Sequence, residues 1–135
     1  MKLYTFISAA ALLFFSGFMM KKQAAPLYDT KWSLKKIYTQ QGTEQVNTKA
    51  FIKFNAANLS AGGNGSCNSF GGTLYVSNDS ISITNIFSTK MYCDGVQQTE
   101  DSFFNQLEKA TRYKIKEKTL LLYEGSTLLL EFMAE

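Results

Sequence analysis

The chain has 135 residues, which is long enough for one globular domain. Its composition, 45% hydrophobic and 19% charged residues, excludes a disordered or collagen-like protein. It has no histidine and only two cysteines, which excludes imidazole catalysis, histidine-containing metal sites and cysteine-only zinc sites, and we expect neither a metal nor a cofactor. The formal charge of +3 comes from Lys2, Lys21 and Lys22, because basic and acidic residues are equal in number after position 22; without clustered Lys and Arg we expect no nucleic-acid binding.

The first predicted element is an export signal. After Lys2, residues 3–20 are mostly apolar and uncharged, which is typical of a secretory signal. These eighteen residues would span about 27 Å as a helix, close to the thickness of a bilayer core. We therefore expect residues 1–25 to be either a signal peptide cleaved before Pro26 or an uncleaved N-terminal membrane anchor. In the second case, only residues 3–20 would contact the membrane. Residues 26–135 are expected to form a single exported domain.

The central part of the chain has the pattern of short strands. Ile52 and Phe54 alternate with the polar Lys53, as on a strand with one buried face. Five of the twelve residues at positions 61–72 are glycine, and we expect a glycine-rich loop there. The predicted strands are 32–38, 51–54, 73–76 and 81–83, with turns at 40–43 and at Asn78-Asp79.

One segment, at about residues 96–110, predicts an amphipathic helix. Glu100 and Asp101 lie early and Lys109 late in this segment, which agrees with the helix dipole. We expect the apolar side of the helix to cover an open face or end of the sheet. The apolar positions that fall on this side are Val96, Phe103, Phe104, Leu107 and Ala110.

Three strands are predicted after the helix, at 112–116, 119–123 and 127–132. Glu117-Lys118 and Glu124-Gly125 are the expected turns. The last two strands are largely apolar at successive positions, so both of their faces are expected to be covered.

Two motifs resemble those of the META domain family, which includes the bacterial heat-shock protein HslJ. Residues 65–72 read Gly-Ser-Cys-Asn-Ser-Phe-Gly-Gly and are similar to the family's G-C-N-x-F-x-G signature, while residues 89–93 are similar to its T-x-M-x-C motif. Ser66 and Tyr92 stand where glycine and alanine are usual. The residues that match are Gly65, Cys67, Asn68, Phe70, Gly72, Thr89, Met91 and Cys93.

This resemblance, over residues 30–132, implies a β-rich α+β fold: a small, partly open antiparallel β-barrel-like domain with one helix. It implies a protein of the periplasm or cell envelope, linked in the family to stress responses, with no established catalytic residues. We expect a non-enzymatic protein that binds an envelope protein or a ligand. The alternative is a carrier that holds a small apolar molecule or lipid inside the barrel.

The resemblance assigns chemistry to Cys67 and Cys93 only. In an oxidising compartment these residues would form a structural disulfide, worth about 3.5 kcal/mol for a loop of this length. Two buried free thiols, or a reactive redox pair, are the alternatives. We also expect the glycines beside Cys67 to take positive φ in tight turns that bring the two cysteines together.

Overall fold

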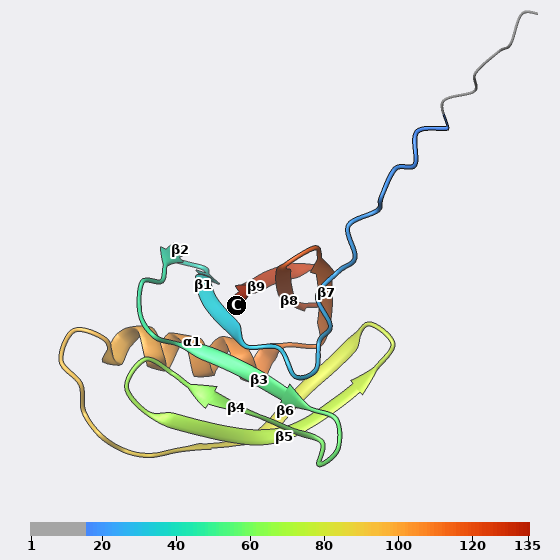
Figure 1. Cartoon of the computed structure of the whole chain (residues 1–135). Coiled ribbons are helices and arrows are strands. Elements are labelled where there is room, and N and C mark those ends of the chain that lie inside the picture. Colours follow the sequence, from blue (N-terminus) through green and yellow to red (C-terminus); the bar gives the residue numbers. More distant parts are fainter. Residues whose placement is uncertain (1–15) are drawn as a thin grey trace, which may run out of the picture.

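The structure, a computed structural model, describes residues 16–135. Residues 1–15 of the predicted export signal lie outside the described residues. No helix within residues 16–135 is long and apolar enough to span a membrane. The described part of the leader extends away from the domain (Figure 1), and the chain joins the domain at Ala25, whose backbone N–H donates to the carbonyl of Glu117 at 2.8 Å.

The domain contains nine strands and one helix. The strands are β1 (Trp32–Thr39), β2 (Gly42–Gln45), β3 (Phe51–Asn55), β4 (Ser60–Asn64), β5 (Ser69–Ser77), β6 (Ser80–Ser88), β7 (Arg112–Lys116), β8 (Thr119–Glu124) and β9 (Thr127–Ala134). The helix, α1 (Gln97–Lys109), lies between β6 and β7 in the chain. Its bounds confirm the helix predicted at about 96–110.

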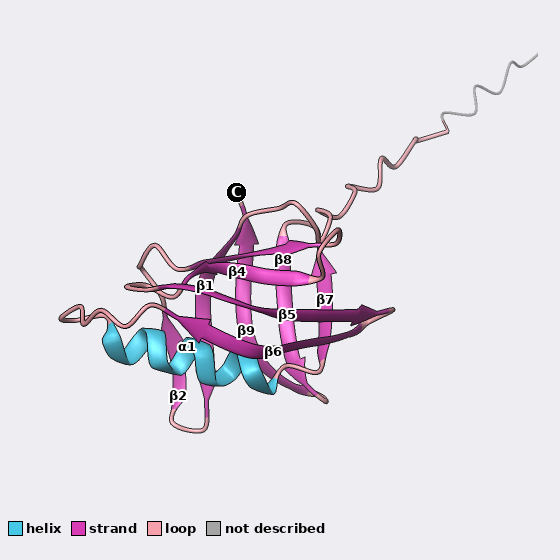
Figure 2. Ribbon diagram, turned by 90° about the horizontal axis from the view of Figure 1, so that it is seen from below, coloured by secondary structure: helices cyan, strands magenta, loops and turns pink. Residues whose placement is uncertain are grey.

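The strands form one antiparallel sheet that closes almost completely on itself (Figures 1 and 2). Each strand from β3 to β8 pairs with the strand that follows it in the chain, and β1 joins the two ends by pairing with both β3 and β9. The junction between β6 and β7 is a single residue pair, Ser80 with Arg112. The sheet is therefore a near-closed ring rather than a true barrel, which confirms the expected partly open, barrel-like fold with one helix.

Alternating side chains fill the interior of the ring. Ile52 and Phe54 are buried on β3 while Lys53 between them is exposed, as the period of a strand requires. Trp32 is fully buried and its indole N–H donates to the carbonyl of Leu27 at 3.0 Å, which holds the segment before β1 against the core. The largest buried side chains are Trp32, Phe54, Phe103 and Phe132.

Helix α1 lies across one end of the ring (Figure 2), in contact with β1, β6, β8 and β9. Phe103 and Leu107 point into the ring and are fully buried, so the helix seals the end that the sheet leaves open. The terminal hairpin β8–β9 is also covered as expected: Leu120, Leu122 and Leu130 face the core, and Leu121 and Leu128 are half-buried on the other side.

Two expectations about secondary structure are wrong. The predicted turn at 40–43 ends two residues earlier, at Gln41, because Gly42 begins β2, a short strand that pairs with the second half of β1. The predicted glycine-rich loop is mostly strand: residues 61–64 belong to β4 and residues 69–72 to β5. Glycine suits these strands because neighbouring strands leave no room for a Cβ there. A Cβ on Gly63 would collide with the backbone carbonyl of Phe51 on β3.

Candidate functional site

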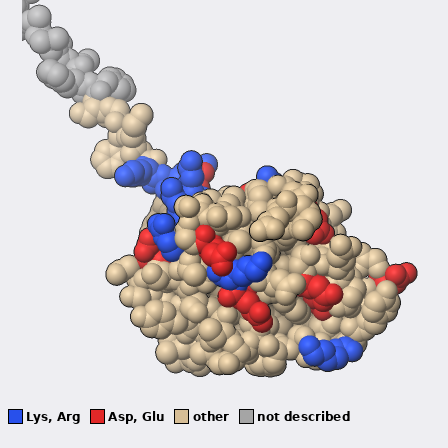
Figure 3. Space-filling view, turned by 180° about the vertical axis from the view of Figure 1, so that it is seen from behind, with Lys and Arg blue, Asp and Glu red and all other residues tan. Residues whose placement is uncertain are grey.

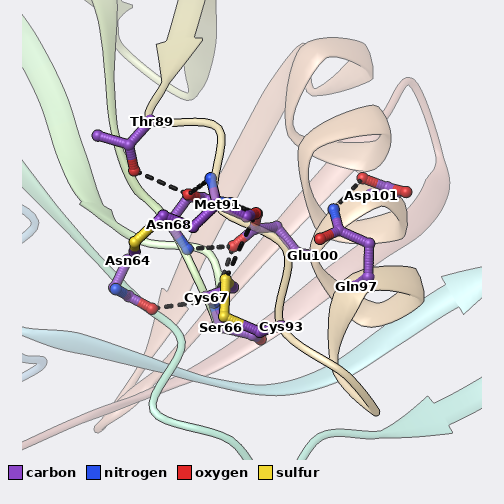
Figure 4. The surroundings of a disulfide bond; sticks show 10 residues. All are labelled: Asn64, Ser66, Cys67, Asn68, Thr89, Met91, Cys93, Gln97, Glu100 and Asp101. Carbon is purple, nitrogen blue, oxygen red and sulfur yellow. Dashed lines mark hydrogen bonds between the residues drawn. A yellow bond between two sulfur atoms is a disulfide. The ribbon is translucent and has the colours of Figure 1, made fainter.

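The two family-like motifs meet beside the N-terminus of α1. The first motif supplies the turn at residues 65–68 between β4 and β5, and the second supplies the segment at residues 89–93 between β6 and α1. Cys67 and Cys93 form a disulfide with their Cα atoms 5.8 Å apart, and no described cysteine is free (Figure 4). The turn is buried, whereas the second segment runs along the surface.

Asn68 connects the two motifs through its side chain. Its amide oxygen accepts hydrogen bonds from the Thr89 hydroxyl and the Met91 backbone N–H, each at 2.8 Å. Its amide nitrogen donates to the Met91 carbonyl at 3.0 Å and to Glu100 Oε1 at 2.6 Å. The side chain is only 3% exposed, and all of its donors and the usual two acceptor positions are occupied. Asn68 therefore holds the backbone of the surface segment from inside the domain.

Glu100, in the first turn of α1, completes this network (Figure 4). The residue is 1% exposed, and its Oε2 accepts the backbone N–H groups of Cys67 at 2.9 Å and Asn68 at 2.7 Å. No basic side chain of residues 16–135 forms an ion pair with it. Hydrogen bonds from the turn, together with the positive end of the helix dipole, stabilise a carboxylate that would otherwise be costly to bury.

The turn between β4 and β5 depends on Gly65 for space and not for a positive φ. A Cβ on Gly65 would lie 2.5 Å from Cζ of Phe104 and 2.7 Å from Oε2 of Glu100. The positive φ in this turn belongs to Ser66, at 129°. The expectation that glycines beside Cys67 take positive φ is therefore wrong. Gly65 instead allows close packing of α1 against the turn.

Phe70 and Gly72 lie on β5, so the first motif is a loop only as far as Asn68. The Phe70 ring packs against Phe103, with ring centroids 5.6 Å apart, and against Phe104, at 5.1 Å. Gly72 faces the neighbouring strand, where a Cβ would lie 3.0 Å from the carbonyl oxygen of Thr84. These two motif positions therefore pack the sheet against α1 and against itself.

Three exposed apolar side chains accompany the second motif: Phe87 is 70% exposed, Met91 59% and Tyr92 76%. We call these three residues the apolar segment. Both backbone polar groups of Met91 are bonded to Asn68, yet its side chain faces solvent. The Phe87 ring lies over Gly71 of β5, where a Cβ would be 2.8 Å from the ring. The backbone of the segment is thus fixed while its side chains remain accessible.

Sequence reasoning missed Glu100 as a member of this cluster and assigned it only to the helix dipole. A signal was present: Glu100 lies four residues after Val96, three before Phe103 and seven before Leu107, which places it on the apolar side of α1. A carboxylate at such a position must be buried with hydrogen-bond partners. The sequence did not reveal that these partners are the N–H groups of a turn 32 and 33 positions away.

The charges and potential metal ligands of the described residues form no further cluster here. No three Cys, Asp or Glu side chains within residues 16–135 come together as they would around a metal ion. In Figure 3, basic and acidic atoms are interspersed over the face shown, and basic atoms gather where the N-terminal segment leaves the domain.

Comparison with known proteins agrees with the motifs. The sequence model of the META domain matches residues 25–135. None of the curated proteins compared with the chain is similar to it in sequence. An NMR structure of a protein from Burkholderia xenovorans is similar, with a TM-score of 0.68 and 20% identity over 81% of this chain and 83% of that one.

Two further solved structures have the same fold. One is an NMR structure with a TM-score of 0.58 and 17% identity, over 77% of this chain and 88% of the other. The second is the crystal structure of a DUF4847 family protein from Bacteroides vulgatus, with a TM-score of 0.57 and 16% identity over 79% and 93% of the two chains. At these identities the likeness shows the fold alone, and none of the names states an activity.

Proposed function

The chain belongs to the META domain family, and we propose that it is an exported, non-enzymatic protein of the cell envelope that binds another protein through its apolar segment. The proposal includes a contribution to stress tolerance, which rests on the family alone. The observation that carries the binding role is the combination of a fixed backbone and exposed apolar side chains at Phe87, Met91 and Tyr92.

A fixed apolar surface favours binding for two physical reasons. Covering exposed apolar side chains with a partner removes them from water and lowers the free energy of the complex. Aromatic residues and Met are also enriched at protein interfaces. A segment already held by Asn68 and by the disulfide loses little conformational entropy on binding, so more of the contact energy contributes to affinity. A mobile loop of the same composition would bind more weakly.

The carrier alternative requires an apolar cavity inside the ring. Among the described residues the interior is occupied by the aromatic and aliphatic core, and two hollows lie between α1 and neighbouring hairpins. Both are lined mainly by polar side chains. These observations favour surface binding over transport of a small apolar molecule.

Photocrosslinking tests the binding role. A photoreactive phenylalanine derivative would replace Tyr92 in cells that natively produce the protein, and the matched control would place it at Tyr75, which is 63% exposed on β5. We expect one discrete adduct from position 92 and none from position 75. Phe87→Ser should weaken the adduct without lowering the melting temperature. The same adducts from both positions, or none from position 92, would refute the role of the apolar segment.

Export is tested separately by deleting residues 2–20 and fractionating the cells. We expect the full chain outside the cytoplasm and the deleted chain inside it, because the uncharged apolar stretch is the predicted signal. Unchanged export of the deleted chain would contradict this. N-terminal sequencing of the exported protein distinguishes the two predicted forms: a start at Pro26 indicates cleavage, and an intact leader indicates an anchor.

A further inference from the structure

A polar cleft of about 500 Å³ lies between α1 and two hairpins of the ring. One wall is the second half of α1, from Ser102 to Lys109. The others are residues 38–41 of the β1–β2 hairpin, and Glu124 with residues 127–129 of the β8–β9 hairpin. The cleft shares no lining residue with the apolar segment. Its size is within the usual range of small-molecule sites.

Two residues of opposite charge, on adjacent backbone segments, line this cleft. Lys109 is in the last turn of α1 and Glu124 ends β8. Thr111, two residues after Lys109, is bonded on both sides of Glu124: its backbone N–H donates to the Tyr123 carbonyl at 2.8 Å, and its hydroxyl accepts the Gly125 N–H at 2.9 Å. These bonds keep the two backbones adjacent. Within residues 16–135, neither charged side chain forms an ion pair.

The rest of the cleft offers amide and hydroxyl groups. Gln106 is 5% exposed, and its amide N–H donates to the Tyr38 carbonyl, which fixes its orientation. Gln40 and Asn105 add further amides, and Leu128 and Leu129 provide apolar contact. The Tyr38 hydroxyl already donates to Glu131 at 3.0 Å. The cleft therefore suits a ligand with a charged end and a polar, uncharged remainder.

We propose that this cleft binds a free α-amino acid with a polar side chain, its carboxylate contacting Lys109 and its ammonium group contacting Glu124. In an α-amino acid both charges are attached to the same carbon atom, which matches two opposite charges that line the cleft from adjacent backbone segments and form no ion pair within residues 16–135. Each contact is a charge-assisted hydrogen bond, the stronger kind. The amide groups of Gln40 and Asn105 are then placed to bind the polar side chain.

Isothermal titration calorimetry of the full chain with L-glutamine tests the proposal. We expect binding at millimolar concentration or below, and at least about tenfold weaker binding by Lys109→Ala and by Glu124→Ala. Lys114→Ala, which removes an exposed charge on β7 outside the cleft, is the matched control and should bind as the unchanged protein does. All three positions are exposed, so the substitutions should leave the fold intact, and the melting temperature checks this.

Altered ligands test the two contacts individually. N-acetyl-L-glutamine lacks the ammonium group and L-glutamine α-amide lacks the carboxylate, and we expect both to bind at least about tenfold more weakly than L-glutamine. Equal binding of either analogue, no binding of L-glutamine at millimolar concentration, or unchanged binding by both Ala variants would overturn the proposal. Tighter binding of the dipeptide glycyl-L-glutamine would also overturn it, because it would assign the cleft to peptides.

Discussion

Asn68 and Glu100 are 32 positions apart in sequence, yet the amide nitrogen of Asn68 donates to the carboxylate of Glu100 at 2.6 Å inside the domain. Both residues are almost fully buried. Through this pair, α1 is joined to the turn between β4 and β5, and the other bonds of Asn68 extend the connection to Met91. The hydrogen bonds that position the helix therefore also position the surface segment.

The direction of this hydrogen bond predicts the outcome of a double-mutant cycle. Asn68→Asp replaces the donating amide by a carboxylate that faces Glu100, and we expect a loss of at least about 3 kcal/mol in unfolding free energy. Glu100→Gln should cost about 1–3 kcal/mol, because its amide can place a donor against the Asn68 donor.

The double variant should lose at least about 1 kcal/mol less unfolding free energy than the sum of the two single losses, because the Gln amide can then donate to the Asp carboxylate. Chemical denaturation of the four proteins measures the coupling. Strictly additive losses would show that the two side chains do not interact as the structure describes.

The disulfide should contribute to stability as a single unit. Thiol counting on the denatured, non-reduced protein should find about zero free thiols per chain, because Cys67 and Cys93 are bonded to each other. Cys67→Ala and Cys93→Ala should each lower the unfolding free energy by about 2–5 kcal/mol, with the double variant no worse than either single one. About two free thiols per chain would show that the disulfide is not formed. Two buried free thiols or a redox-active pair would then be the remaining interpretations.

Gly63→Ala should destabilise the ring more than Gly62→Ala does. At Gly63 the added Cβ collides with the backbone carbonyl of Phe51, which cannot move without shifting β3. At Gly62 the Cβ would lie 3.1 Å from the carbonyl oxygen of Phe70, which needs only a small adjustment. Melting temperatures of the two variants test this order, and the reverse order would show that β3 and β4 do not approach as closely at Gly63 as the structure describes.

Leu130→Ala tests the terminal hairpin. Leu130 on β9 is fully buried and pairs with Leu122 of β8, so the substitution leaves a cavity and should cost about 2–5 kcal/mol. Leu121→Ala, on the other face of β8, is the matched control and should cost less because that residue is only half-buried. Equal losses of unfolding free energy in the two variants would show that both faces of the terminal hairpin are buried in the core.

The sequence predicted the regular part of the fold because the period of its apolar residues was clear. Arg112–Lys116 was predicted with its observed bounds, and α1 within one residue at each end. Strand β4 and the first four residues of β5 were missed because their glycines are required by neighbours that lie elsewhere in the chain, such as Phe51 beside Gly63 and Phe87 beside Gly71. β2 was missed because its residues are polar and its strand conformation depends on pairing with β1.

The candidate site was predictable only in part. The family-like motifs pointed to Cys67, Asn68, Thr89 and Met91, and the structure brings all four together. The role of Asn68 as the link between motifs could not be read from its position, because hydrogen bonds between distant side chains leave no periodic pattern. The disulfide that the family resemblance implied joins Cys93, between β6 and α1, to Cys67 in the turn.

Backbone ¹⁵N relaxation at Met91 and Tyr92 tests most directly the claim that the apolar segment is held rigid from inside the domain. With Asn68 bonded to both backbone groups of Met91, we predict order parameters of about 0.85 for these two residues, as in regular secondary structure. The exposed turn at Gly125 is the internal reference for greater mobility. Order parameters below about 0.6 at Met91 and Tyr92 would contradict the account, because the apolar side chains would then sit on a flexible loop.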